Sequence, residues 1–166
     1  MSLEQIKNMM KTHVFDDICL VGFVYAEENE LTEFIASMRC LFLEFGNKII
    51  KVEEMEQFSK LSLTVVDDIH IDIDVENFIP AKSRISNVVF HNPLSDNIVS
   101  EIVLFNMEEH EARVICDVFK LVLLNKQELF FDPSFLGINV GGSEVEALWR
   151  NNQLKGYKAI PTVIKL

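Results

Sequence analysis

Hydrophobic and polar residues alternate most regularly in residues 61–76. Apart from the break at Asp67, the apolar residues all hold odd positions: Leu61, Leu63, Val65, Ile69, Ile71, Ile73 and Val75. A three-residue loop at 66–68 would keep both apolar rows on one face, so the pattern predicts a β-hairpin with strands at 61–65 and 69–75. One strand of fifteen residues keeps the same phase but would be unusually long.

Two longer segments show the spacing of amphipathic helices. In residues 31–45 the apolar side chains recur at intervals of three and four, and Gly46 ends the run: Leu31, Phe34, Ile35, Met38, Leu41, Phe42 and Phe45. Residues 108–125 place a second set inward: Val114, Ile115, Val118, Leu121 and Val122. We therefore expect two long helices here, and shorter ones at 2–13 and 143–153.

The remaining apolar runs are short and predict strands. They lie at 18–26, 48–52, 87–91, 128–131 and 159–165, while 98–105 fits either type. Pro161 places the last strand at a sheet edge. The expected fold is a single α+β domain over 1–166, with a mostly antiparallel sheet packed against the two long amphipathic helices in a single layer.

Composition and charge narrow the classes of partner. The chain has 166 residues, of which 49% are hydrophobic, and its net charge is −11. This charge disfavours nucleic acid and anionic membranes, and it favours a basic protein partner. The charge is uneven, because residues 147–166 carry +4 and residues 1–146 carry −15. A basic tail of this kind is expected to dock on the acidic body.

The cysteines and the apolar runs indicate a compartment. The three cysteines, Cys19, Cys40 and Cys116, lie among apolar neighbours and form no metal-ligand spacing, so we expect buried free thiols and no cofactor. The longest uncharged apolar run, 18–26, is too short to cross a bilayer. The expected location is cytoplasmic.

The polar positions of the alternating segment carry a row of ionisable groups. They are Asp68, His70, Asp72, Asp74 and Glu76, and no Lys or Arg lies between Lys60 and Lys82. Carboxylates about 7 Å apart repel by about 0.6 kcal/mol in water and by about 2.4 kcal/mol at a dielectric of 20. The row is therefore a solvated face, a docking surface for a basic partner, or a metal site.

Two hypotheses for function follow from this row. In the first, the row binds a basic protein together with a second acidic patch formed by Glu27, Glu28, Glu30 and Glu33. In the second, Asp72 and Asp74, with His70 as a third ligand, hold a divalent metal in an enzyme that acts on a phosphorylated substrate.

Other enzyme motifs are incomplete. The glycines of 137–146 lack the P-loop lysine, and His110-Glu111 lacks the second histidine of a zincin. In size, charge and lack of a catalytic signature, the chain resembles the bacterial immunity proteins that neutralise co-encoded toxins. This likeness is one of general character. It implies a small acidic inhibitor, not an enzyme, that captures a basic partner such as a toxin nuclease by electrostatic attraction.

Overall fold

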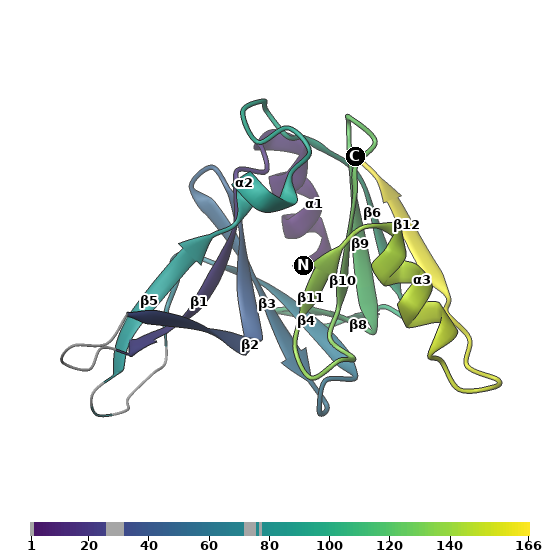
Figure 1. The fold of residues 1–166 in the computed structure, drawn as a ribbon. Helices are drawn as coiled ribbons and strands as arrows, with labels where there is room; N and C mark the ends of the chain where they lie inside the picture. Colours follow the sequence, from purple (N-terminus) through teal and green to yellow (C-terminus); the bar gives the residue numbers. More distant parts are fainter. Residues whose placement is uncertain (1, 26–31, 72–75, 77) are drawn as a thin grey trace.

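Two antiparallel sheets make up most of the protein (Figure 1). The computed structural model describes residues 2–25, 32–71, 76 and 78–166. Within these residues the seven-stranded sheet has the order β5-β1-β2-β3-β4-β8-β7, and the five-stranded sheet has the order β11-β10-β9-β6-β12.

The bounds of the elements are as follows. The helices are α1 (Ser2–Thr12), α2 (Ser86–Val89) and α3 (Ser143–Asn151). The seven-stranded sheet contains β1 (Asp17–Tyr25), β2 (Glu33–Phe45), β3 (Lys48–Met55), β4 (Lys60–Val66), β5 (Phe78–Arg84), β7 (Glu108–Glu109) and β8 (Val114–Cys116). The five-stranded sheet contains β6 (Val99–Phe105), β9 (Val118–Leu123), β10 (Glu128–Asp132), β11 (Asn139–Gly141) and β12 (Pro161–Lys165).

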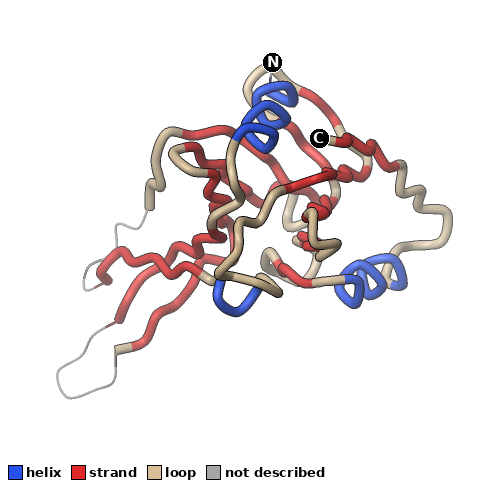
Figure 2. Tube along the Cα trace, turned by 90° about the horizontal axis from the view of Figure 1, so that it is seen from above, coloured by secondary structure: helices blue, strands red, loops and turns tan. Residues whose placement is uncertain are grey.

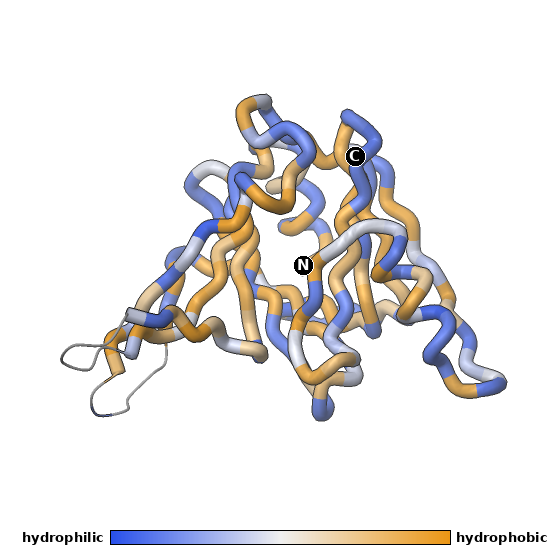
Figure 3. Tube along the Cα trace, viewed as in Figure 1, coloured by the Kyte–Doolittle hydropathy of each residue, from blue (hydrophilic) through white to orange (hydrophobic). Residues whose placement is uncertain are grey.

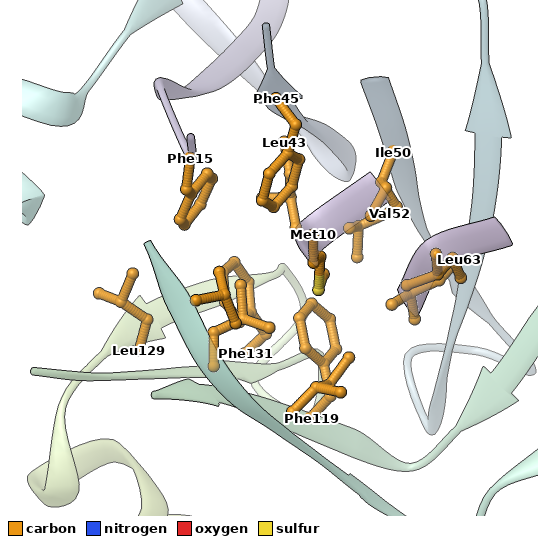
Figure 4. Packing of buried hydrophobic residues seen from close by; sticks show 14 of the residues in the cluster. Met10, Phe15, Leu43, Phe45, Ile50, Val52, Leu63, Phe119, Leu129 and Phe131 are labelled. Carbon is orange, nitrogen blue, oxygen red and sulfur yellow. The ribbon is translucent and has the colours of Figure 1, made fainter. Parts of the chain in front are cut away.

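The main hydrophobic core lies between the two sheets. Leu43, Ile50 and Leu63 from the first sheet meet Phe119 and Phe131 from the second (Figure 4). The helix α1 lies between the sheets and contacts β4 on one side and β6 on the other. Its apolar residues Ile6, Met9 and Met10 complete the cluster. Burial of these side chains is the main force that holds the sheets together.

The helix α3 covers the outer face of the five-stranded sheet. Its Trp149 is buried against Phe105 and Phe130, with ring centroids at 5.3 and 5.6 Å. Trp149 is therefore a core residue. No helix of the described residues is long and apolar enough to span a membrane.

The prediction of an α+β fold with two long amphipathic helices is wrong. Of the residues that the structure describes, 50% are in strands and 16% in helices, and these helices are short. The expected helix at 31–45 is the strand β2, which pairs with β1 and β3. A shift in the β1–β2 register interrupts the alternation, and Phe42 and Leu43 are buried on opposite faces. Because the alternation is interrupted and both faces are buried, the apolar residues of β2 have a spacing in the sequence that resembles that of an amphipathic helix.

The expected helix at 108–125 is also made of strands. The chain runs through β8 in one sheet and β9 in the other, and only Asp117 separates them. Residues on both faces of β9 are buried, as Val118 and Phe119 show. The result is a nearly continuous apolar run, which periodicity alone does not distinguish from a buried helix.

The predicted hairpin at 61–75 is wrong where the structure describes it, and residues 72–75 of its second strand lie outside the described residues. β4 pairs with β3 and β8, so that Val65 faces Ile50 instead of Ile69. The predicted strand at 87–91 is largely the short helix α2. The helices at 2–13 and 143–153 and the strands at 18–26, 48–52, 128–131 and 159–165 are confirmed within a few residues. β12 is an edge strand, as Pro161 predicted.

Candidate interaction surface

Three strands continue beyond the core as an arm, which we define as residues 22–25, 33–36 and 78–81. β1 is its middle strand, because Tyr25 pairs with Glu33 on one side and with Phe78 on the other. Figures 1 and 2 both show the ends of β1, β2 and β5 extending away from the rest of the molecule. Residues 26–32 join β1 to β2 and residues 67–77 lead into β5, so Glu33 and Glu76, the described ends of two acidic segments, lie close to the end of β1 at Tyr25.

The arm begins at an irregularity in the sheet. Leu20 pairs with Leu41, but Gly22 pairs with Ala36, so β2 has several more residues than β1 at this point. Within the extra residues, the Ile138 amide donates to the Met38 carbonyl at 3.3 Å, which ties β2 to the loop after β10. A bulge of this kind bends a strand out of its sheet.

The arm exposes apolar side chains as well as charge. Ile35 on the outer face and Ile79 on the inner face are exposed, and Met38 at the base is 61% exposed. The Phe23 and Phe78 rings lie 4.4 Å apart and are only partly buried. Exposed apolar residues beside charged ones are typical of protein interfaces. The sequence reasoning missed these residues, because Ile35 and Met38 were assigned to the core face of a helix.

Residues 69–71 of the alternating segment lie on one face of the seven-stranded sheet. Ile69 and Ile71 pack on the outer face of the seven-stranded sheet, beside Val21, Phe42 and Val66. Asp68, which precedes Ile69, and His70, which lies between the two isoleucines, are exposed. Within residues 68–71, the two isoleucines therefore face the sheet and the two polar side chains are exposed, although Ile69–Ile71 does not form a strand.

The other predicted site residues are placed only in part. Glu76 is exposed in a turn, and Glu33 is exposed at the start of β2. Asp72 and Asp74 of the row, and Glu27, Glu28 and Glu30 of the second patch, lie outside the described residues. The topology nevertheless brings the ends of both predicted patches together, since Glu33 pairs with Tyr25 and Glu76 is two residues before Phe78.

The described acids of the two segments form no ion pair, although only Glu33 and Glu76 lie near the tip and Asp68 follows the end of β4. Asp68, Glu76 and Glu33 make no ion pair with any residue that the structure describes. Two nearby arginines are engaged elsewhere: Arg84 donates to both Glu44 oxygens at 2.7 and 2.8 Å, and Arg39 lies 3.4 Å from Glu54. The bonds to Glu44 raise the pKa of Arg84, so this guanidinium stays charged and paired.

His70 lines a cavity of about 360 Å³ between the sheet and residues 70–71. The cavity wall also carries Arg39 and Lys51, whose ion pairs with Glu54 and Glu53 lie in the same wall. No group of three His, Cys, Asp or Glu residues that could hold a metal occurs in the described parts of the chain. The metal hypothesis requires Asp72 and Asp74, which lie outside those parts, and it stays a prediction.

A second polar cluster holds the C-terminal segment and was not predicted. The Asn106 amide donates to Asp117 at 2.7 Å, to the Tyr157 hydroxyl at 3.0 Å and to the Lys158 carbonyl at 2.9 Å. Tyr157 also donates to Asp117. Burial, and then this bond, raises the pKa of the Tyr157 phenol. Asn106 has a φ of 51°, a conformation that asparagine tolerates well, which is the signal that sequence reasoning overlooked.

Two of the three cysteines are buried and unreactive. Cys19 and Cys116 are buried free thiols, as expected, and Cys40 is partly buried. Burial raises the pKa of the Cys19 and Cys116 thiols, which keeps them protonated and unreactive.

Comparisons with protein-family models, with curated proteins and with solved structures found no match to this chain.

Proposed function

We propose that this chain is a binding protein that captures a basic protein partner with its acidic arm. The observation that carries the proposal is that Glu33 and Glu76, the described ends of two acidic segments, lie close to the end of one projecting, three-stranded arm. Residues 26–33 and 67–77 contain nine acids and no Lys or Arg. The described members of this group, Asp68, Glu76 and Glu33, are exposed.

Electrostatics favours a cationic partner over a structural role for these acids. A carboxylate that faces water keeps its hydration, and it gains attraction when a cation approaches. The attraction acts within about 8 Å at physiological salt, so a projecting tip is favourably placed for contact with a cleft. Exposed Ile35, Ile79 and Met38 then supply apolar area that charge alone does not provide.

The finer form of the proposal is an immunity-type inhibitor of a toxin nuclease. Nucleases bind phosphate backbones through basic clefts, and a row of carboxylates can occupy such a cleft in place of phosphate. The general likeness to bacterial immunity proteins, in size and charge, supports this form. The proposal requires no catalytic group on this chain.

The experiment is affinity capture from native lysate, with an arm variant and a matched control. Glu33→Gln with Glu76→Gln removes two exposed charges near the tip of the arm, whereas Asp96→Asn with Glu111→Gln removes two exposed charges elsewhere. The wild type and the control variant should capture the same basic protein in stoichiometric amount. The arm variant should associate with it about threefold more slowly, or slower still, at low salt.

Two results would contradict the proposal. One is capture of no basic partner by the wild type. The other is an association rate that is equal in the arm variant and the wild type. The inhibitor form is tested separately, by adding the chain to the captured partner and measuring cleavage of RNA and DNA.

A further inference from the structure

The segment between α3 and β12 is fixed in place by hydrogen bonds, not by the charge of its lysines. The Asn106 side chain accepts from the Ile160 amide at 3.0 Å and donates to the Lys158 carbonyl at 2.9 Å, and the Asn106 amide donates to the Ile160 carbonyl at 2.8 Å. Lys155 and Lys158 form no ion pair with a described residue, so the expectation that the basic tail docks on the body by charge is wrong for them. In Figure 3 this segment is the largely hydrophilic loop at the lower right, so an ordered polar surface lies here.

A cavity of about 540 Å³ lies beside this segment and brings together side chains from distant parts of the chain. This volume is within the range of small-molecule sites, about 300–1,000 Å³. We call it the Trp149 cavity. Its wall includes Phe58 and Lys60 at the β3–β4 turn, Asn106 after β6, Asp117 between β8 and β9, Trp149 of α3 and Tyr157 beyond α3.

Two residues of the wall hold unusual backbone conformations. Phe58 has a φ of 63° and Asn106 a φ of 51°, both in the left-handed region. Asparagine tolerates this region, whereas a bulky residue such as phenylalanine is strained there. The Phe58 amide donates to the Glu54 carboxylate at 3.0 Å, which helps to hold the turn. Strain of this kind persists only where the surrounding structure fixes it, and it is concentrated at ligand sites.

Several polar atoms of the wall have no partner among the residues that the structure describes. Both bonds to the Asp117 carboxylate, from Asn106 and Tyr157, end at Oδ2, and Oδ1 accepts none. Gln153 donates to the Trp149 carbonyl at 2.7 Å, but its Oε1 accepts from no described donor. Trp149 is 3% exposed, and its indole N–H donates to no described residue, although a buried indole N–H ordinarily has a partner. The wall therefore offers a ligand two acceptors and one donor.

The charges of the wall favour a neutral ligand. Lys60 lies 3.1 Å from Glu108, so this cation is paired within the wall, and the Asp117 carboxylate adds a negative charge. An anion such as phosphate is therefore disfavoured. An organic cation is disfavoured as well, because the Arg150 guanidinium already lies 5.6 Å from the centroid of the Trp149 ring and Lys60 lies in the wall.

We propose that the Trp149 cavity binds a neutral sugar. A hydroxyl group both donates and accepts, so the hydroxyls of one sugar can satisfy the Asp117 and Gln153 oxygens and the indole N–H together. Its apolar C–H groups pack against the aromatic side chains of the wall, Phe58 and Tyr157. The bonds of Asn106 hold the wall before a ligand arrives, so little conformational entropy is lost on binding. The cavity shares no residue with the arm, and this inference is independent of the proposed function.

The test follows the fluorescence of Trp149, the only tryptophan in the sequence, during titration with neutral sugars. The panel is glucose, galactose, mannose, N-acetylglucosamine, ribose, maltose and cellobiose, each at up to about 50 mM. At least one sugar should change the emission saturably, and saturation-transfer difference NMR should show contact of the same sugar with the protein. Inorganic phosphate and choline, titrated in the same way, represent the two charged classes of ligand.

Two variants each change one feature of the wall. Asp117→Asn keeps an oxygen for the bonds from Asn106 and Tyr157 but replaces the other oxygen by an NH₂ group, and Phe58→Gly removes the ring at a position whose backbone suits glycine. Each should weaken binding of the sugar about tenfold, as expected for the loss of one good contact. Asp96→Asn, exposed in the loop before β6, is the matched control and should bind as wild type does. Circular dichroism melts identify the variants that are folded.

The inference is overturned if no sugar of the panel gives a saturable signal by either method. It is also overturned if the folded wall variants bind as wild type does, or if Asp96→Asn weakens binding to the same extent. Saturable binding of phosphate or choline, but of no sugar, would assign the cavity to a charged ligand and overturn the sugar as its occupant. None of these results bears on the capture experiment, so failure of one proposal is distinguished from failure of the other.

Discussion

At the scale of single residues, Gly22 decides whether the arm can form. A Cβ atom at this position would lie 1.9 Å from the Ile35 carbonyl oxygen and 2.8 Å from the Ile35 carbonyl carbon. Both neighbours are backbone atoms of the paired strand, so the clash is relieved only by moving β2. The absence of a side chain here permits the close approach of two strands at the bulge.

Gly22→Ala should therefore lower the free energy of unfolding by about 1–3 kcal/mol, in the range of overpacked interiors. Urea denaturation followed by circular dichroism measures this. Ala81, which pairs with Gly22 on β5, supplies the control. Ala81→Gly should cost less than about 1 kcal/mol, because it adds chain entropy without a clash. Equal stability of Gly22→Ala and wild type would show that the approach of the strands is looser than described.

Glu146 is the residue that makes stability depend on acid pH. Its carboxylate accepts from Lys120 at 2.9 Å and from Arg150 at 3.0 Å. Burial alone would raise its pKa, but the two bonds outweigh burial, and the pKa lies below the ordinary value of 4.5. Because the folded pKa is lower than the unfolded one, the carboxylate contributes stability that is complete above 4.5 and is lost as pH falls through the folded pKa.

Glu146→Gln should lower the unfolding free energy at pH 7 by about 1–2 kcal/mol, between the values for exposed and buried ion pairs. The difference from wild type should shrink as the pH falls below 4.5. Chemical denaturation at a series of pH values measures both. Glu111→Gln, at an exposed position without such partners, should follow the wild-type curve. A difference that stays constant at all pH values would rule out the ionised pair as its cause.

At the scale of elements, the hydrophobic pattern correctly predicted helices and strands whose pattern lies within one element. Where pairing between distant strands determines the structure, the predicted element type was wrong. The helix α1 and the strands β1, β3, β10 and β12 were recognised because each pattern lies within one element. β2 was mistaken for a helix because its bulge shifts the alternation in mid-strand. β8 and β9 were mistaken for a single helix because the chain passes from one sheet to the other at Asp117.

The candidate site was also predicted only in part. The alternation in 67–71 correctly separated Ile69 and Ile71, which pack on the sheet, from the exposed Asp68 and His70. The approach of Glu76 to Glu33 at the end of β1 was not predicted, because it depends on pairing of β5 with β1 across more than fifty residues. No local pattern contains that information.

The docking of α3 is a further property of an element, and it rests on Trp149. Trp149→Ala would empty a space between Phe105 and Phe130 and should cost about 3–5 kcal/mol of stability. Thermal melting of this variant beside Trp149→Phe, which refills most of the space, measures the cost. Little change in Trp149→Ala would mean that α3 contributes little to the folded state.

At the scale of the whole molecule, the two hypotheses for function differ in their response to metal. A binding protein requires no ion, whereas the metal-dependent alternative requires a site at Asp72 and Asp74. We expect calorimetric titration with Mg²⁺, Mn²⁺ and Zn²⁺ at millimolar concentration to show no heat that Asp72→Asn with Asp74→Asn removes. A saturable signal that this variant abolishes would favour the enzyme.

The central claim is that the arm presents negative charge to solvent, ready for a cationic partner. Paramagnetic relaxation by soluble nitroxides measures this directly, since the ratio of effects from a cationic and a neutral probe reports the local potential at each backbone amide. The account predicts the highest ratios at the arm amides of residues 23–25 and 78–79, and a fall of these ratios in Glu33→Gln with Glu76→Gln. Equal effects of the two probes along the arm would contradict it.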